Sequence, residues 1–137
     1  METVMNFEEL REMLLYRRIV KWNENTIALD NGVEVSIEET DQDCCAHAYG
    51  EFEDVVLDAA ITEVGDIQYE PWSDDDTYGC IATMTIMHNR NIICKASANA
   101  DAGNGGYYYS VASFVVKVPM KSDRFCYFVG SEEGMDE

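Results

Sequence analysis

The stretch that decides the fold is YGCIATMTIMH at residues 78–88, followed by NRN at 89–91 and IICKASAN at 92–99. Two runs rich in Ile, Thr, Ala and Met flank a short polar turn, which is the pattern of an antiparallel hairpin. A third apolar run covers Tyr107–Val118, and Asp123–Val129 fits a last short strand that pairs with it. The second half of the chain therefore predicts a β-meander.

Strand patterns also fill the chain before the meander. Ile19–Trp22 and Thr26–Leu29 are short apolar runs, and Val33–Ile37 alternates apolar and acidic residues. The dipeptide Asn31-Gly32 between the last two runs is typical of a tight hairpin turn. Ile61–Tyr69 alternates as well, and Pro71 ends that strand or places it at a sheet edge.

Two segments have helical spacing. Residues 7–17 begin after Asn6, a good N-cap residue, and Glu9 stands where a capping box requires it. A second, short helix is predicted over Gly50 to Ala60, with a buried face made by Phe52, Val55, Val56 and Ala59.

These elements predict one α+β domain over residues 1–130, followed by an acidic, frayed tail at 131–137. We expect the N-terminal helix to cover a curled antiparallel sheet, either a sandwich or an open barrel. A chain of 137 residues is long enough to bury a core of its own.

The formal net charge is −18, and the charge is unevenly distributed. No Lys or Arg occurs between Lys21 and Arg90, whereas 17 acids lie between Glu24 and Asp76. This charge makes the chain a poor candidate for direct binding to nucleic acid, and we expect none, because phosphate contacts depend on Lys and Arg. No apolar run is long enough for a membrane span, and the acidic N-terminus lacks a signal peptide. We therefore expect a cytoplasmic protein.

No catalytic or metal-binding constellation stands out. Cys44, Cys45 and His47 are close in sequence, but their spacing does not match a zinc site. The odd number of cysteines indicates reduced thiols that pack as small hydrophobes. We expect no enzyme activity, no cofactor and no metal.

Carboxylates that alternate along a strand lie on one face, about 6.6 Å apart, and such rows resemble a phosphate backbone. They could occupy the basic groove of a nucleic-acid-binding protein, although a merely solvated face fits the same pattern. The candidate residues are Glu34, Glu38, Glu39, Asp41, Asp43, Glu51, Glu53, Asp74, Asp75 and Asp76.

A nucleotide ligand is the alternative. Asn104-Gly105-Gly106 could present backbone N–H groups to an anion, and the tyrosines that follow could stack on a base. For these tyrosines themselves, packing in a central strand that is buried on both sides is the favoured interpretation. The candidate ligand-binding residues are Arg90, Lys95, Asn104, Tyr107, Tyr109, Lys117 and Arg124.

Two stretches carry a family resemblance. One runs from Asp30-Asn31-Gly32 through Asp43-Cys44-Cys45-Ala46 to Ile61-Thr62-Glu63-Val64, and the other is Asn104-Gly105-Gly106-Tyr107-Tyr108. Over residues 26–118 the chain resembles an uncharacterised small-domain family found in bacteriophage and bacterial genomes. It departs from the pattern by an extra glycine and a third tyrosine. The resemblance implies a phage origin but no activity for any residue.

Together these features predict a phage-type counter-defence protein that acts in the host-cell cytoplasm without catalysis. It would block a basic host protein by mimicking nucleic acid. An oligomeric sponge for a nucleotide immune signal is one alternative, since pockets form readily at repeated interfaces. A structural or regulatory phage protein is another.

Overall fold

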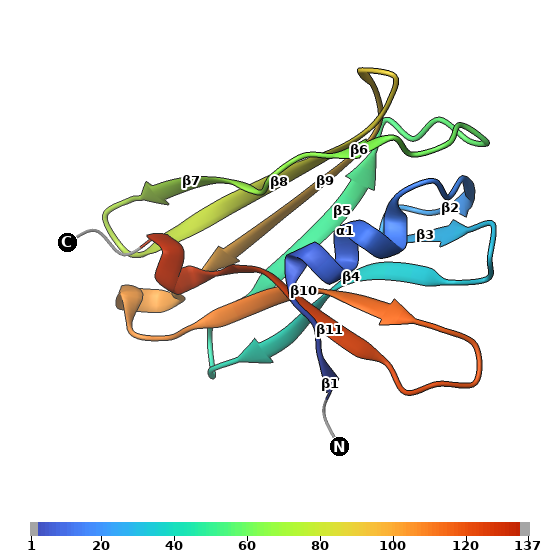
Figure 1. Cartoon of the computed structure of the whole chain (residues 1–137). Coiled ribbons are helices and arrows are strands. Elements are labelled where there is room, and N and C mark those ends of the chain that lie inside the picture. The colour runs from blue at the N-terminus through green and yellow to red at the C-terminus, as the bar shows by residue number, and fades with distance from the viewer. Residues whose placement is uncertain (1–2, 135–137) are drawn as a thin grey trace.

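The computed structural model of the chain describes residues 3–134. Strands hold 54% of the residues and helices 11%, so the fold is mostly β and the predicted α+β class is wrong. The strands form two antiparallel sheets that do not close into a barrel (Figure 1). One short helix is too little to form a helical layer of its own.

The elements have the following bounds. The helices are α1 (Phe7–Leu14) and the 3₁₀ turns η1 (Asn104–Gly106) and η2 (Ser131–Gly134). The strands are β1 (Thr3–Val4), β2 (Ile19–Trp22), β3 (Thr26–Leu29), β4 (Glu34–Gln42), β5 (Ala48–Glu53), β6 (Glu63–Val64), β7 (Gln68–Ser73), β8 (Tyr78–His88), β9 (Asn91–Asp101), β10 (Ser110–Lys117) and β11 (Arg124–Gly130).

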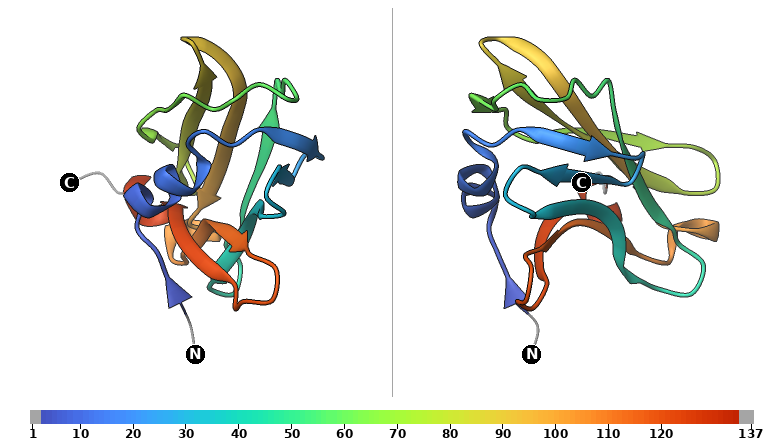
Figure 2. Two further views of the ribbon diagram at one scale, coloured as in Figure 1. Left: turned by 45° about the vertical axis from the view of Figure 1, so that its right-hand side comes forward. Right: turned by 90° about the vertical axis from the view of Figure 1, so that its right-hand side faces the viewer.

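The larger sheet has the strand order β1-β11-β10-β4-β3-β2. Its neighbours are antiparallel except for β1, which pairs in parallel with β11. Asp41 pairs with Val111 and Glu39 pairs with Ala112, so Thr40 is an extra residue that makes a bulge in β4. Bulges bend a strand and increase its twist, and this sheet curls into an arch (Figure 2).

The smaller sheet has the order β5-β9-β8-β6, and β7 continues beside β8. The predicted hairpin is confirmed, because β8 spans residues 78–88 and pairs along its whole length with β9. Its turn is made by Asn89 and Arg90, which both have positive φ (48° and 72°). That conformation matches the right-handed twist of the paired strands.

The core lies between the two sheets and is continuous. Alternate residues of each strand point into it, such as Phe114 and Phe128 from the larger sheet and Phe52 from the smaller one. The rings of Phe114 and Phe128 stack with their centroids 4.3 Å apart. Apolar side chains on facing sheets are the main stabilising contribution of such a fold.

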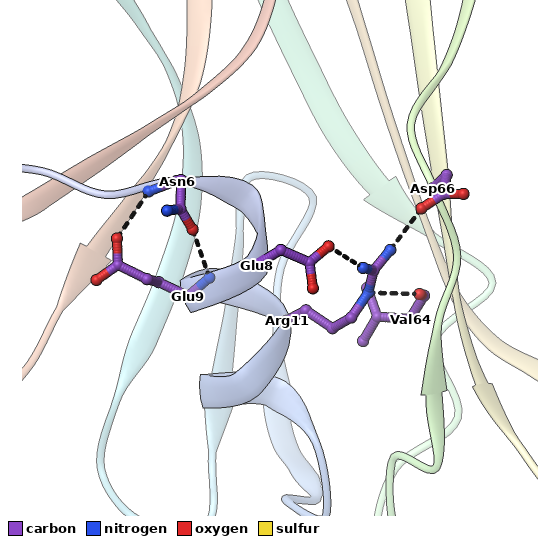
Figure 3. Close-up of polar contacts among 6 residues, drawn as sticks. All are labelled: Asn6, Glu8, Glu9, Arg11, Val64 and Asp66. Carbon is purple, nitrogen blue, oxygen red and sulfur yellow. Dashed lines mark hydrogen bonds and ion pairs between the residues drawn. The ribbon is translucent and has the colours of Figure 1, made fainter.

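The helix α1 begins as predicted (Figure 3). The side chain of Asn6 accepts the N–H of Glu9 (2.8 Å), and the Glu9 carboxylate accepts the N–H of Asn6 (3.1 Å), so the capping box is confirmed. The helix ends at Leu14, before the predicted end at residue 17, because the C-cap Leu15 takes an extended backbone (φ −59°, ψ 135°) and Tyr16 follows with a positive φ of 69°.

Arg11 connects this helix to the smaller sheet (Figure 3). Its Nε donates to the carbonyl of Val64 in β6 (3.0 Å), and its guanidinium pairs with Asp66 (2.6 Å) and with Glu8. Both carboxylates raise the pKa of Arg11, and its hydrogen bond to Asp66 is the largest cause. The helix thus lies across the gap between the sheets instead of forming a separate layer.

The predicted helix over residues 50–60 is wrong. Residues up to 53 belong to β5, in which Ala48, Gly50 and Phe52 point inward with a period of two. A turn follows, in which Asp54 and Asp58 have positive φ. Pairing with β9 holds residues 48–53 in a strand, and that long-range contact overrides the local helical spacing.

The predicted strand over 61–69 is divided into β6 and the start of β7. Pro71 belongs to β7 and lies opposite Cys80 of β8. It is at the margin of the smaller sheet, as the sequence indicated. The first residues of the expected acidic tail, 131–134, form η2 instead, and Ser131 and Gly134 are buried; residues 135–137 lie outside the described part. None of the helices in residues 3–134 has the length and apolar character that a bilayer crossing requires.

Candidate functional site

Four connecting segments meet on the left of Figure 1, and we call them the loop end: residues 41–47, 73–78, 101–110 and 130–134. Backbone N–H groups join them, from Asp43 to the carbonyl of Tyr109 (2.8 Å), from Ala102 to the carbonyl of Tyr78 (2.9 Å), and from Ser110 to the hydroxyl of Ser131 (3.1 Å). These bonds fix the four segments as one surface.

The two stretches that carry the family resemblance touch at the loop end. Gly103 precedes the Asn-Gly-Gly-Tyr-Tyr stretch and has a positive φ of 69°. A Cβ added there would lie 2.7 Å from the carbonyl oxygen of Cys45, in the Asp-Cys-Cys-Ala stretch. Glycine is needed at this position both for its backbone conformation and for the close approach.

The loop end is strongly acidic. Its residues include eight carboxylates and no Lys or Arg: Asp41, Asp43, Asp74, Asp75, Asp76, Asp101, Glu132 and Glu133. Every Lys and Arg of the chain lies outside these four segments. The sequence placed the acids in the middle of the chain, and the fold adds Asp101, Glu132 and Glu133 to them. The result is a negative field concentrated at one end of the molecule.

Some of these carboxylates hold the loops in place. Asp74 Oδ1 accepts the N–H groups of Asp76 and Thr77, both at 2.8 Å, and these bonds lower the pKa of Asp74. Asp101 Oδ1 accepts the N–H groups of His47 and Gly103, both at 3.0 Å. The exposed carboxylates of Asp75 and Glu132 point toward solvent at the same end.

The other predicted acids do not share this surface. Glu34 lies at the far end of β4, and Glu38 pairs with Lys117 at 3.4 Å. Glu51 and Glu53 are exposed on the outer side of β5, in the smaller sheet. Five of the ten acids therefore lie at the loop end, three lie along β4 and two lie on the outer side of β5. The bulge also breaks the expected row of alternating carboxylates in β4, where the Glu39 carboxylate accepts the N–H of Ala48 (2.8 Å).

The candidate nucleotide-binding residues are not brought together. Asn104, Tyr107 and Tyr109 lie at the loop end, whereas Arg90 lies in the β8–β9 turn. Three of the cations have acidic partners elsewhere: Lys95 with Asp54 (3.7 Å), Lys117 with Glu38 (3.4 Å) and Arg124 with Glu9 (2.8 Å). The N–H of Gly105 donates to the carboxylate of Asp76 (3.3 Å), so this loop already holds an anion of the protein itself.

The three consecutive tyrosines precede β10 instead of belonging to a central strand. Tyr107 is 85% exposed and Tyr109 is 39% exposed, so the favoured prediction of core packing is wrong for both. The hydroxyl of Tyr109 donates to Asp41 Oδ1 (3.2 Å), and this bond raises the pKa of Tyr109. The loop end therefore presents aromatic rings beside its carboxylates.

The cysteines divide into two groups. Cys80, Cys94 and Cys126 are buried free thiols, as expected, and burial raises the pKa of each. The sulfurs of Cys44 and Cys45 lie within bonding distance as a disulfide between adjacent residues, contrary to the expectation of reduced thiols. Within residues 3–134, no group of three or more His, Cys, Asp or Glu side chains is placed to hold a metal ion.

Sequence reasoning missed the part that the C-terminal segment plays. Gly134 packs directly on the backbone of Gly79 in β8, which brings η2 to the loop end. The hydroxyl of Tyr127 in β11 donates to Glu133 (2.9 Å). Alternation along β11 indicates that Tyr127 points outward, but nothing in the sequence pairs the two glycines.

The fold and the loop end define a two-sheet β domain with an acidic surface built from its connecting segments. The family model described as "Domain of unknown function (DUF7448)" matches residues 12–115, so the chain belongs to that family. Comparisons with curated proteins and with solved structures give no significant match.

Proposed function

We propose that this chain is a phage-type counter-defence protein that binds a basic, nucleic-acid-binding host protein and blocks it without catalysis. The observation that supports this most is the loop end, with eight carboxylates and no Lys or Arg. Carboxylates fixed on a rigid scaffold attract the groove that normally holds phosphates, and the attraction weakens as salt screens it. The phage origin rests on the sequence resemblance alone.

The site geometry favours this proposal over the nucleotide sponge. A sponge needs cations close to its stacking rings, whereas Lys95, Lys117 and Arg124 are each paired with an acid away from the loop end. The N–H of Gly105 already donates to the carboxylate of Asp76, whose charge would repel an anionic ligand.

The test starts with the purified full chain, incubated with host lysate at low salt and studied by native mass spectrometry. We expect a complex with a basic protein that high salt dissociates, and one equivalent of the chain should release nucleic acid from that protein. A small mass adduct on a symmetric oligomer would support the sponge instead. No complex and no adduct would contradict both and favour a structural or regulatory role.

Two double variants locate the surface. Asp75→Asn with Glu132→Gln removes two charges from the loop end, and Glu51→Gln with Glu53→Gln removes two from the outer side of β5. We expect the first pair to weaken binding roughly tenfold at low salt and to flatten the salt dependence. The second pair should change little. Equal effects from both pairs would show that only the net charge matters and would remove the loop end from the proposal.

A further inference from the structure

A groove runs along the outer face of the larger sheet, on the side away from the core. It has a volume of about 460 Å³, within the range of roughly 300–1,000 Å³ typical of ligand sites. A second hollow of about 240 Å³ continues it toward the loop end, and the two share Asp41, Val111 and Tyr127. The groove is therefore an extension of the acidic surface onto the sheet.

The bulge at Thr40 creates one wall of this groove. Because Thr40 is an extra residue in β4, its side chain and that of Asp41 both face the groove, although they are consecutive. The hydroxyls of Thr40 and Ser113 form a hydrogen bond of 2.7 Å across the strands. Without the bulge, alternation would turn one of the two β4 side chains toward the other face.

The opposite wall is apolar and aromatic. It is made by Val4 of β1 and by Phe125 and Tyr127 of β11. Val4 is 71% exposed and Tyr127 is 43% exposed, so apolar surface remains uncovered there. The hydroxyl of Tyr127 donates to Glu133, which fixes the direction of the ring.

The groove thus combines carboxylates on one side with an aromatic face on the other. Its lining contains no Lys or Arg, and the lining residue Glu38 pairs with Lys117. Asp41 accepts the hydroxyl of Tyr109 through one oxygen and has further lone pairs to offer. A planar cation that stacks on a ring and pairs with a carboxylate satisfies both walls at once.

We propose that this groove binds an extended, arginine-bearing segment of the basic partner, with a guanidinium between Tyr127 and Asp41. Arginine fits better than lysine, because its flat group stacks on aromatic rings and donates two parallel hydrogen bonds to a carboxylate. The inference rests on the proposed function, since it names the part of a basic partner that this surface recognises.

The experiment compares deca-arginine with deca-lysine, which have equal length and charge, by calorimetric titration of the full chain at low salt. We expect deca-arginine to bind about tenfold more tightly. Tyr127→Leu should remove most of that preference while leaving deca-lysine unchanged. Tyr49→Leu, a variant of an exposed tyrosine on β5 in the other sheet, is the matched control and should keep the preference.

Asp41→Asn is a second test of the groove if the Tyr127→Leu variant does not fold. Asp41 is exposed, and the asparagine amide has nearly the same shape as the carboxylate that it replaces. It should lower the preference for deca-arginine several-fold. Equal affinity for the two peptides, or a preference that survives both variants, would overturn the groove proposal. If both peptides bind equally and the double variant Asp75→Asn with Glu132→Gln still weakens their binding, the proposed function stands without the groove. If neither peptide binds, the proposed function fails as well.

Discussion

Gly103 is the residue on which the geometry of the loop end depends most directly. Its positive φ is unfavourable for any residue with a Cβ. A Cβ there would also lie 2.7 Å from the carbonyl oxygen of Cys45, which belongs to the backbone and cannot rotate away. Gly105 has a similar φ of 75°, but its Cβ would meet only the ring of Tyr107, which is exposed.

We predict that Gly103→Ala destabilises the chain by about 2–4 kcal/mol, whereas Gly105→Ala costs about 1 kcal/mol. The positive φ destabilises both variants, so the difference between their free energies of unfolding measures the cost of the close contact with Cys45. Urea unfolding of the two variants and of the parent chain gives the comparison. If the two free energies of unfolding agree within error, the close approach of the two motif segments is not rigid.

At this scale, local chemistry is predictable from sequence and register is not. The reciprocal bonds of Asn6 and Glu9 depend on residues three apart, so the sequence contains all the information they need. The bulge at Thr40 depends on which residues of β10 lie opposite, and pairing partners 70 residues away leave no local trace. The groove was therefore out of reach of sequence reasoning.

At the scale of elements, α1 shows how a short helix is stabilised. Eight residues are too few for an isolated helix to persist in water. Its buried face, Leu10 and Leu14, packs into the core, and the capping box satisfies the first free N–H groups. Packing and capping therefore replace the stability that length would give.

We predict that Asn6→Ala lowers the free energy of unfolding by about 1 kcal/mol, because the N–H of Glu9 loses its acceptor. Glu12→Ala, an exposed substitution within the same helix, should change it by less than about 0.5 kcal/mol. Thermal unfolding followed by circular dichroism checks both. An Asn6→Ala variant as stable as the parent would mean that packing alone positions α1.

The helix predicted over residues 50–60 is wrong for the same reason that the bulge was missed: both depend on strand partners far away in the sequence. Phe52, Val55, Val56 and Ala59 have the spacing of a helical face, but Phe52 also fits the inward positions of a strand. Short apolar segments satisfy both periods, and the partner decides between them. Here antiparallel pairing with β9 holds residues 48–53 in a strand, and that long-range partner is not visible in the local spacing.

At the scale of the molecule, the fold sorts charge along its length. The basic residues in the second half of the chain lie away from the loop end. Lys117 is the last residue of β10 and Arg124 is the first residue of β11, so both stand at the strand ends far from the loop end. The sequence indicated the excess of acids, and the topology concentrates it. An approaching basic partner would therefore be oriented before contact, with an association rate that falls as salt rises.

Several cysteines and tyrosines of this acidic molecule have a raised pKa; the cysteines lie in the core, and the tyrosines are partly exposed on the outer strands. Burial raises the pKa of Cys94 to about 12 and that of Cys126 to about 11. Partial burial raises the pKa of Tyr69 to about 12, and partial burial together with the hydrogen bond to Glu133 raises the pKa of Tyr127. In the unfolded chain these groups ionise near their ordinary values, about 8.5 for Cys and 10 for Tyr.

We therefore predict that stability falls as the pH rises above about 8.5, because the unfolded chain then binds fewer protons than the folded one. The stabilisation is complete below the unfolded pKa values and is lost as pH approaches the folded ones. Cys94 alone should contribute a loss of roughly 2 kcal/mol by pH 10. Urea unfolding between pH 7 and pH 10 measures the slope, and Cys94→Ala should make it shallower. A free energy of unfolding that stays constant to pH 10 would show that water reaches these thiols and phenols in the folded chain.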